Sequence, residues 1–373
     1  MTDASAPGRP ETPDRPEPRD RPEPPDHPRP APEWTEPGPV QIAPGVHRIP
    51  LPMPNDGLRA VNVYAIDDGD GVTMIDGGWA VAEARTALVK ALDELGHAPG
   101  DIKAILVTHA HRDHYTLAAQ LHRELGVRVG LGEGERVAIA TLNGAKPRSA
   151  TLIDLLREAG APALADQMSG SRPQADGAAE NYDEPDDWLG AGTIGVGDRT
   201  LRVLPTPGHT RGHIVFADEA GGLLFAGDHV LPHITPAIGL EPVPSDSPLS
   251  DYLDSLALIR TLPDLTLLPA HGPVAPSTHA RVDELVAHHD DRLAKTADAV
   301  ASLGNATGAE VAGAIPWTRR QRPFSSLDPG NQMLAITETV AHLRLLVRTG
   351  TLEADGGNPV TYYRLRAAAP RMA

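Results

Sequence analysis

The sequence predicts a mixed α/β protein with a long N-terminal tail and a smaller helical domain at its C-terminus. Between residues 40 and 275, short apolar runs that suit buried strands alternate with segments of helical periodicity. Residues 1–39 contain 13 prolines and almost no apolar side chain to bury, so we expect a disordered, extended tail. Residues 276–373 show three helical stretches followed by a hairpin, which is the outline of a winged helix.

The expected elements follow one another in a definite order. In the first half of the middle domain, strands are expected at 46–51, 61–66, 72–75 and 102–108, and helices at 81–95 and 117–125. Leucines between 152 and 164 indicate helices, and 169–187 loses all periodicity and is expected to be a surface insertion. The later strands are expected at 200–204, 214–216, 223–225 and 265–268. The C-terminal domain has expected helices at 278–301, 307–315 and 331–349 and strands at 351–353 and 360–363.

Composition narrows the possible chemistry. The 373 residues contain no cysteine, which excludes disulfides, thiol nucleophiles, iron–sulfur clusters and cysteine-based zinc sites. Any metal must therefore be held by histidine and carboxylate. The net charge of −17 disfavours nucleic acid as a partner, because its phosphates would be repelled. No apolar run reaches the length of a membrane span and the start lacks the features of a signal peptide, so we expect a cytoplasmic protein.

The strongest chemical signal is the segment Thr108-His109-Ala110-His111-Arg112-Asp113-His114, which follows an apolar strand. Residues two apart in an extended backbone project to the same side, so His109 and His111 can bind one ion. Asp113 and His114 lie where the next helix begins and are displaced enough to serve a neighbouring ion. Four potential ligands within six positions predict a metal site.

With this segment, the sequence resembles the metallo-β-lactamase-fold hydrolase superfamily. The other motifs of that superfamily follow in the expected order, each after a strand: Pro207-Gly208-His209-Thr210, Phe225-Ala226-Gly227-Asp228 and Pro269-Ala270-His271-Gly272. The upstream segment Met74-Ile75-Asp76-Gly77-Gly78 matches the superfamily's strand-end aspartate, which supports the site without binding metal. The resemblance covers residues 40–275 and implies an αββα sandwich there.

The resemblance also implies how the ligands are shared between two ions. His109, His111 and His209 would bind the first metal, Asp113, His114 and His271 the second, and Asp228 would bridge them. Ligands without sulfur suit two Zn²⁺ ions, although Fe and Mn accept the same set. A hydroxide held between the two ions would be the nucleophile, oriented by Asp113.

Further residues near these motifs are candidates for substrate contact. Tyr115 follows the first motif where many relatives carry a small residue, and is expected to reshape the entrance of the site. Arg211 and His233 lie just after two ligand motifs and are expected at its rim. Four histidines on the C-terminal helices are expected to be solvated: His279, His288, His289 and His342.

The leading functional hypothesis is a dinuclear metal hydrolase of a small ester, thioester or lactone, similar to glyoxalase II-like members. The arrangement of the middle domain followed by a winged-helix segment also resembles the β-lactamase-like protein 2 branch, which adds a single-strand endoribonuclease or an acyl-carrier thioesterase as alternatives. A positive groove with stacking aromatics is missing from the sequence, which disfavours RNA. A mononuclear iron sulfur dioxygenase, which would use only the first ligand set, is a further alternative.

Overall fold

The structure is a computed structural model that describes residues 33–144, 150–170, 182–318, 320–356 and 359–367. All the elements described below belong to one compact unit, Trp34–Ala373. The predicted proline-rich tail, apart from its last residues, and most of the predicted insertion at 169–187 lie outside the described residues. No helix among the described residues is long and apolar enough to cross a bilayer.

The first half of the chain builds a seven-stranded sheet in which the strands follow their chain order. Its strands are β1 (Val40–Ala43), β2 (Val46–Pro52), β3 (Ala60–Asp68), β4 (Gly71–Ile75), β5 (Ile102–Val107), β6 (Arg128–Gly132) and β7 (Asp187–Leu189). From β1 through β4 each strand pairs antiparallel with the next, and from β4 through β7 each strand pairs parallel with the next. The carboxyl ends of β4, β5 and β6 therefore lie at one edge of this sheet.

The second sheet has five strands in the order β12-β11-β10-β9-β8. These are β8 (Gly192–Val196), β9 (Arg199–Pro205), β10 (Ile214–Asp218), β11 (Leu223–Gly227) and β12 (Thr266–Pro269). β11 and β12 are parallel, and the other neighbours are antiparallel. The loops that leave β9, β11 and β12 carry the later motifs.

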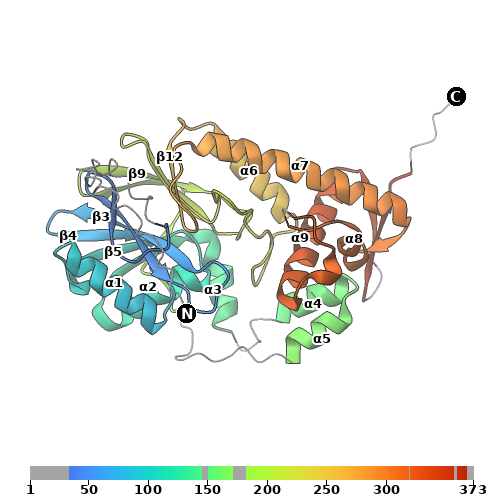
Figure 1. The fold of residues 1–373 in the computed structure, drawn as a ribbon, viewed down its shortest axis with the longest axis horizontal. Coiled ribbons are helices and arrows are strands. Elements are labelled where there is room, and N and C mark those ends of the chain that lie inside the picture. The colour runs from blue at the N-terminus through green and yellow to red at the C-terminus, as the bar shows by residue number, and fades with distance from the viewer. Residues whose placement is uncertain (1–32, 145–149, 171–181, 319, 357–358, 368–373) are drawn as a thin grey trace, which may run out of the picture. The chain divides into compact units, whose positions relative to one another are not determined.

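The two sheets pack face to face between layers of helices (Figure 1). Apolar side chains of both sheets form one core between them, in which the rings of Tyr64 and Phe225 meet edge to face at 5.4 Å. A second core joins the outer face of the first sheet to α1 (Ala82–Glu94) and α2 (Arg112–Leu125). A third joins the second sheet to α6 (Pro248–Arg260) and α7 (Thr278–Leu303). The predicted mixed α/β architecture is confirmed.

The C-terminal region adds helices and a small antiparallel sheet. After α7 come β13 (Ala306–Thr307), α8 (Gly308–Ala314), α9 (Pro329–Arg348), β14 (Leu352–Gly356) and β15 (Thr361–Leu365). Two helices from the middle of the chain, α4 (Ala150–Glu158) and α5 (Pro162–Gly170), share one apolar core with these elements. The core of the C-terminal region thus includes segments that precede residue 276.

The expectation that all four histidines of this region are solvated is wrong for two of them. His289 and His342 are each 1 % exposed, because α7 and α9 pack against one another. His342 Nδ1 donates to the carbonyl of Glu338 (2.7 Å), and its Nε2 lies 3.2 Å from His289 Nδ1. Burial lowers the pKa of His342 to about 4, so this ring is neutral at pH 7.

This buried ring predicts a loss of stability in acid. The folded-state pKa lies below the unfolded value of about 6.5, so the unfolded chain binds more protons as the pH falls. The free energy of unfolding is expected to drop by about 2 kcal/mol between pH 7.5 and pH 5 on account of His342 alone. Urea unfolding of the wild type and of His342→Leu at both pH values measures this effect. The difference in the free energy of unfolding between pH 7.5 and pH 5 should be smaller in the variant. A variant with the same pH dependence as the wild type would contradict the prediction.

Candidate metal centre

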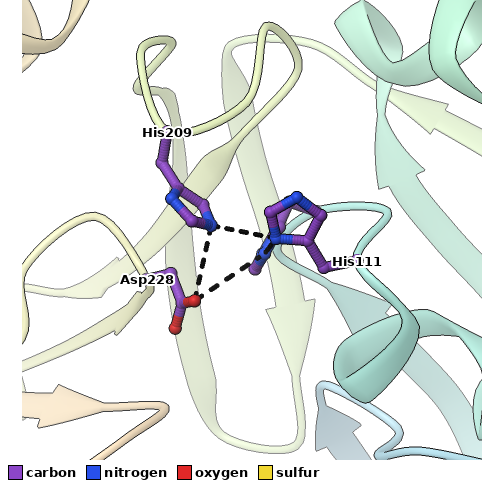
Figure 2. A group of neighbouring side chains, drawn as sticks. His111, His209 and Asp228 are labelled. Atoms are coloured by element: carbon purple, nitrogen blue, oxygen red, sulfur yellow. Dashed lines mark hydrogen bonds and ion pairs between the residues drawn. The ribbon is translucent and has the colours of Figure 1, made fainter. Parts of the chain in front are cut away.

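Three imidazole rings converge where β5 and β9 end. His109 Nε2 lies 2.9 Å from His111 Nδ1, and His209 Nε2 lies 3.0 Å from the same atom. Figure 2 shows the rings of His111 and His209 and the carboxylate of Asp228 turned towards one another. His109 is fully buried and His209 nearly so. The donor atoms of these four side chains all lie within 4.8 Å of one another.

The outer nitrogens of these rings fix which inner nitrogens are free to bind a cation. His111 Nε2 donates to the carbonyl of Leu240 (3.0 Å), and His209 Nδ1 donates to the carbonyl of Ala237 (2.7 Å). Each neutral ring carries one proton, so the nitrogens that face the cluster present lone pairs. Burial lowers the pKa of His209 to about 4, which keeps the ring neutral at pH 7. Rings oriented by hydrogen bonds of this kind are typical of metal ligands.

A second group lies beside the first. Asp113 and His114 occupy the first turn of α2, and His271 follows β12. Asp113 Oδ2 lies 3.6 Å from His114 Nε2 and 3.2 Å from His271 Nε2. His271 Nδ1 donates to the carbonyl of Ala60 (2.8 Å), so its Nε2 faces the group and presents a lone pair when the ring is neutral. Burial acts to lower the pKa of His271, but Asp228 and Asp113 outweigh it and raise this pKa. Again the donor atoms lie within 4.8 Å of one another.

Asp228 lies between the two groups and offers one oxygen to each. Its Oδ2 is 3.4 Å from His209 Nε2 and 4.0 Å from His109 Nε2. Its Oδ1 is 3.5 Å from His271 Nε2 and 3.7 Å from His114 Nε2. The geometry is that of a carboxylate able to join two cation sites.

Several of these atoms need a partner that the described residues do not supply. His114 Nε2, His271 Nε2 and Asp228 Oδ1 are buried without a hydrogen bond from any described residue. A buried polar atom left unpaired costs about 1–3 kcal/mol, and a cation would remove that cost. The donors are nitrogen and oxygen throughout, a set that suits Zn²⁺ and is also accepted by Fe and Mn. The residues therefore fit a divalent metal centre.

The sequence profile of the metallo-beta-lactamase superfamily matches residues 56–271, which is more than half of the chain. The chain belongs to this superfamily. This confirms the predicted α/β metallo-β-lactamase fold, which is followed here by C-terminal helices. Membership of the superfamily also implies that the protein binds divalent metal.

Two solved structures of superfamily members resemble the chain over most of its length. A metallo-beta-lactamase family protein from Thermus thermophilus is 30 % identical with a TM-score of 0.73, covering 87 % of this chain and 100 % of that one. A beta-lactamase domain protein from Burkholderia ambifaria is 28 % identical with a TM-score of 0.72, covering 88 % of this chain and 93 % of that one.

Curated relatives carry hydrolase names. A probable metallo-hydrolase of Bacillus subtilis is 27 % identical over 308 residues, covering 80 % of this chain and 90 % of that protein. An atrochrysone carboxyl ACP thioesterase of Aspergillus fumigatus is 26 % identical over 275 residues, covering 70 % of this chain. This chain spans only half of the length of the thioesterase.

Asp76 contacts the first motif through Thr108 and His114. It follows β4 with φ of 60°, and its carboxylate accepts hydrogen bonds from the backbone and hydroxyl of Thr108 at 2.8 and 3.0 Å. Asp76 Oδ2 also lies 2.9 Å from His114 Nδ1. One carboxylate thus connects the ends of β4 and β5 and orients a ring of the second group.

His213 is a positioning residue that the sequence analysis missed. This fully buried ring accepts the backbone N–H of Asp228 at its Nε2 (3.2 Å). Its Nδ1 lies 2.9 Å from the hydroxyl of Thr206, and the ring stacks on His109 at 5.0 Å. The available signal was the repeated Gly-His pair, since His213 follows His209 by four residues within the same loop.

Glu135 is a second positioning residue that was missed. It ends the short 3₁₀ turn Glu133–Glu135 after β6, is 1 % exposed, and accepts the hydroxyl of Thr210 beside His209. Burial raises the pKa of Glu135 to about 7. The backbone of the His209 loop passes so close to Glu135 that position 212 requires glycine, because a Cβ at Gly212 would lie 2.1 Å from the backbone nitrogen of Glu135. Glu135 therefore ties the His209 loop to the first sheet.

The predicted substrate contacts lie elsewhere. Tyr115 is 1 % exposed within the core under α2, where its hydroxyl donates to the carbonyl of Asp183, so it does not shape the entrance. Arg211 lies in a separate hollow with Arg344 and Arg348. His233 lies in another hollow beside α7. Among the described residues, neither side chain lines the cavity over the metal groups.

That cavity has a volume of 820 Å³ and contains parts of both groups: His111, Asp113, His209, Asp228 and His271. Its walls come from three sources: the loop after β2, the segment 231–240 after β11, and the first turns of α9. Tyr182, which stacks on Tyr115 at 6.2 Å between ring centres, also lines it. The C-terminal region therefore forms part of the candidate active site.

Glu135 provides a test of how the His209 loop is held. We expect Glu135→Ala to weaken zinc binding by about 10–100-fold and to lower the melting temperature, because Thr210 loses its acceptor. Glu135→Gln should retain most of the affinity, since its amide oxygen can accept the same hydroxyl. Chelator competition measures the zinc affinity, and Glu133→Ala, an exposed neighbour, is the control. Wild-type affinity in Glu135→Ala would contradict this role.

Proposed function

We propose that the chain is a dinuclear metal hydrolase of small esters, thioesters or lactones. The observation that carries the proposal is Asp228, whose two carboxylate oxygens face two separate ligand groups. Superfamily membership and hydrolase-named relatives make the chain a metal-dependent hydrolase. The number of metals, their ligands and the substrate are the proposal. The proposed ligands are His109, His111 and His209 for one Zn²⁺, Asp113, His114 and His271 for the other, and Asp228 for both.

Two bound divalent ions would lower the pKa of a water molecule and stabilise the oxyanion that develops on a carbonyl substrate. The chain's own residues set up that chemistry. Burial acts to raise the pKa of Asp113, but His114 and His271 outweigh it and hold this pKa below the usual range. Asp113 is therefore ionised, and its carboxylate lines the cavity, where it can accept a hydrogen bond from a water or hydroxide and orient it.

The substrate class is supported by the relatives and by the cavity. One relative is named as a thioesterase and another as a metallo-hydrolase. The cavity of 820 Å³ has the size of a small-molecule site. Arg112 is the one lysine or arginine among the described residues that line it, which disfavours the endoribonuclease alternative.

The winged-helix assignment is part of the same proposal. Helices α7, α8 and α9 are followed by the β14–β15 hairpin, and β13 completes a three-stranded antiparallel sheet in the order β13-β15-β14. This order of elements supports a winged-helix-like domain. In this protein its role is to close the cavity with the start of α9 rather than to bind nucleic acid.

Metal content tests the dinuclear part of the proposal. We expect the purified protein to hold close to two transition-metal ions per chain, because two ligand groups are present with a shared carboxylate. Elemental analysis after dialysis against metal-free buffer measures this. At most one tightly bound ion, with iron dominant, would favour the sulfur dioxygenase alternative.

Substitutions at Asp228 and Asp76 separate a bridging ligand from a supporting carboxylate. Asp228→Ala should lose one ion and reduce ester hydrolysis by orders of magnitude, since two cations would face one another without a shared anion. Asp76→Ala should reduce metal affinity or the hydrolysis rate by only about 10–100-fold, because the Asp76 carboxylate orients His114 and the end of β5 without binding metal. Asp93→Ala, exposed on α1, is the control. Two retained metals and normal turnover in Asp228→Ala would overturn the assignment of the bridge.

A further inference from the structure

Outside the proposed ligands, the lining of the cavity over the metal groups is mostly apolar. Seven large aliphatic side chains from three segments line it: Met53, Leu58, Leu231, Ile234, Leu240, Met333 and Leu334. Met333 and Leu334 lie in the first turns of α9, so the C-terminal region contributes directly to this wall. Both are half-buried, which leaves part of each side chain open to a ligand. A wall of this kind gains free energy by covering an apolar group.

The one arginine of the described cavity lining is already engaged. Arg112 Nη2 donates to Asp56 Oδ2 (3.0 Å), and its guanidinium lies 4.3 Å from the centre of the Trp79 ring. Asp56 is itself fixed, since its other oxygen accepts the backbone N–H of Leu58 (2.9 Å). Arg112 and Asp56 thus form a neutral pair at the rim, without a spare charge for a phosphate or carboxylate.

The start of α9 also disfavours an anion. Helix N-termini attract anions through their free N–H groups, and Gly330 and Asn331 bring this one to the cavity. Here Asp328 caps the helix and accepts the backbone N–H of Asn331 (3.0 Å). A carboxylate therefore already occupies the position that an anionic ligand would take.

We infer that the substrate presents an uncharged apolar acyl chain to this wall, with the acyl carbonyl at the metal groups. The inference rests on the proposed function and adds the substrate class. A thioester carrier with charged groups finds no cationic side chain within the described lining of the cavity beyond the paired Arg112, so the apolar acyl part lies inside and the carrier outside. Leu334, on the second turn of α9, is the specificity-determining residue best placed to limit the chain length.

Two measurements test this class. The first is hydrolysis by the zinc-loaded enzyme of N-acetylcysteamine thioesters with acetyl, butanoyl, hexanoyl, octanoyl and decanoyl groups. The second is calorimetric binding of uncharged N-methylalkanamides with the same acyl lengths to the metal-free protein. Each CH₂ that enters the wall is expected to raise kcat/KM and the binding constant about threefold to fourfold, corresponding to about 0.8 kcal/mol.

Variants of Leu334 connect the effect to this wall. Leu334→Trp should shorten the preferred chain, lowering kcat/KM for the octanoyl and decanoyl thioesters more than for the acetyl thioester, and Leu334→Ala should extend the preferred chain. Leu303→Trp, on an exposed leucine at the end of α7, is the matched control. If Leu334→Trp fails to fold, Leu334→Ala and the wild-type length series still decide the question.

The outcomes separate the inference from the proposed function. Hydrolysis of all thioesters without a length dependence would overturn the inference and leave the hydrolase intact. A length dependence in amide binding without hydrolysis of any thioester would overturn the proposed function and, with it, the acyl assignment. A rate that rises along a series of alkyl acetates but not along the acyl series would place the chain on the leaving group, against the inference.

Discussion

The position of the Asp228 carboxylate is the constraint on which the site depends. Its two oxygens lie between two groups of ring nitrogens whose lone pairs converge. The backbone N–H of Asp228 is held by His213, and β11 and β12 place it opposite His271. Unpaired, these buried donors and the carboxylate would destabilise the fold by several kcal/mol, so a bound cation stabilises the arrangement. Folding and metal binding are thereby coupled.

The fold serves this constraint by bringing strand ends together. The residues after β4, β5, β9, β11 and β12 all lie at one edge of the two packed sheets. Around them, carbonyls and carboxylates fix each ring: Leu240, Ala237 and Ala60 accept from three of the histidines. Glu135 adds a tie from the neighbouring loop. Rigid surroundings of this kind keep ligands within the tolerance that catalysis requires.

The features that depend on local sequence pattern could be predicted from the sequence. Each motif histidine follows an apolar run, so its place at a strand end could be predicted. The missed features depend on tertiary packing. Glu135 lies in a glycine-rich segment beside a second glutamate, Glu133, and nothing local shows that Thr210 will lie against Glu135. Tyr115 was placed at the entrance because many relatives carry a small residue at this position of the motif. The helix begins at Arg112, and a rotation of about 100° per residue turns Tyr115 into the core. His342 is buried only because α7 covers α9.

The most direct test of the account is anomalous diffraction from crystals of the zinc-loaded protein, recorded on both sides of the zinc absorption edge. The account predicts two anomalous peaks, one beside His109, His111 and His209 and the other beside Asp113, His114 and His271. Each peak should be in contact with a different oxygen of Asp228. A single peak, or an Asp228 carboxylate turned away from both, would contradict it.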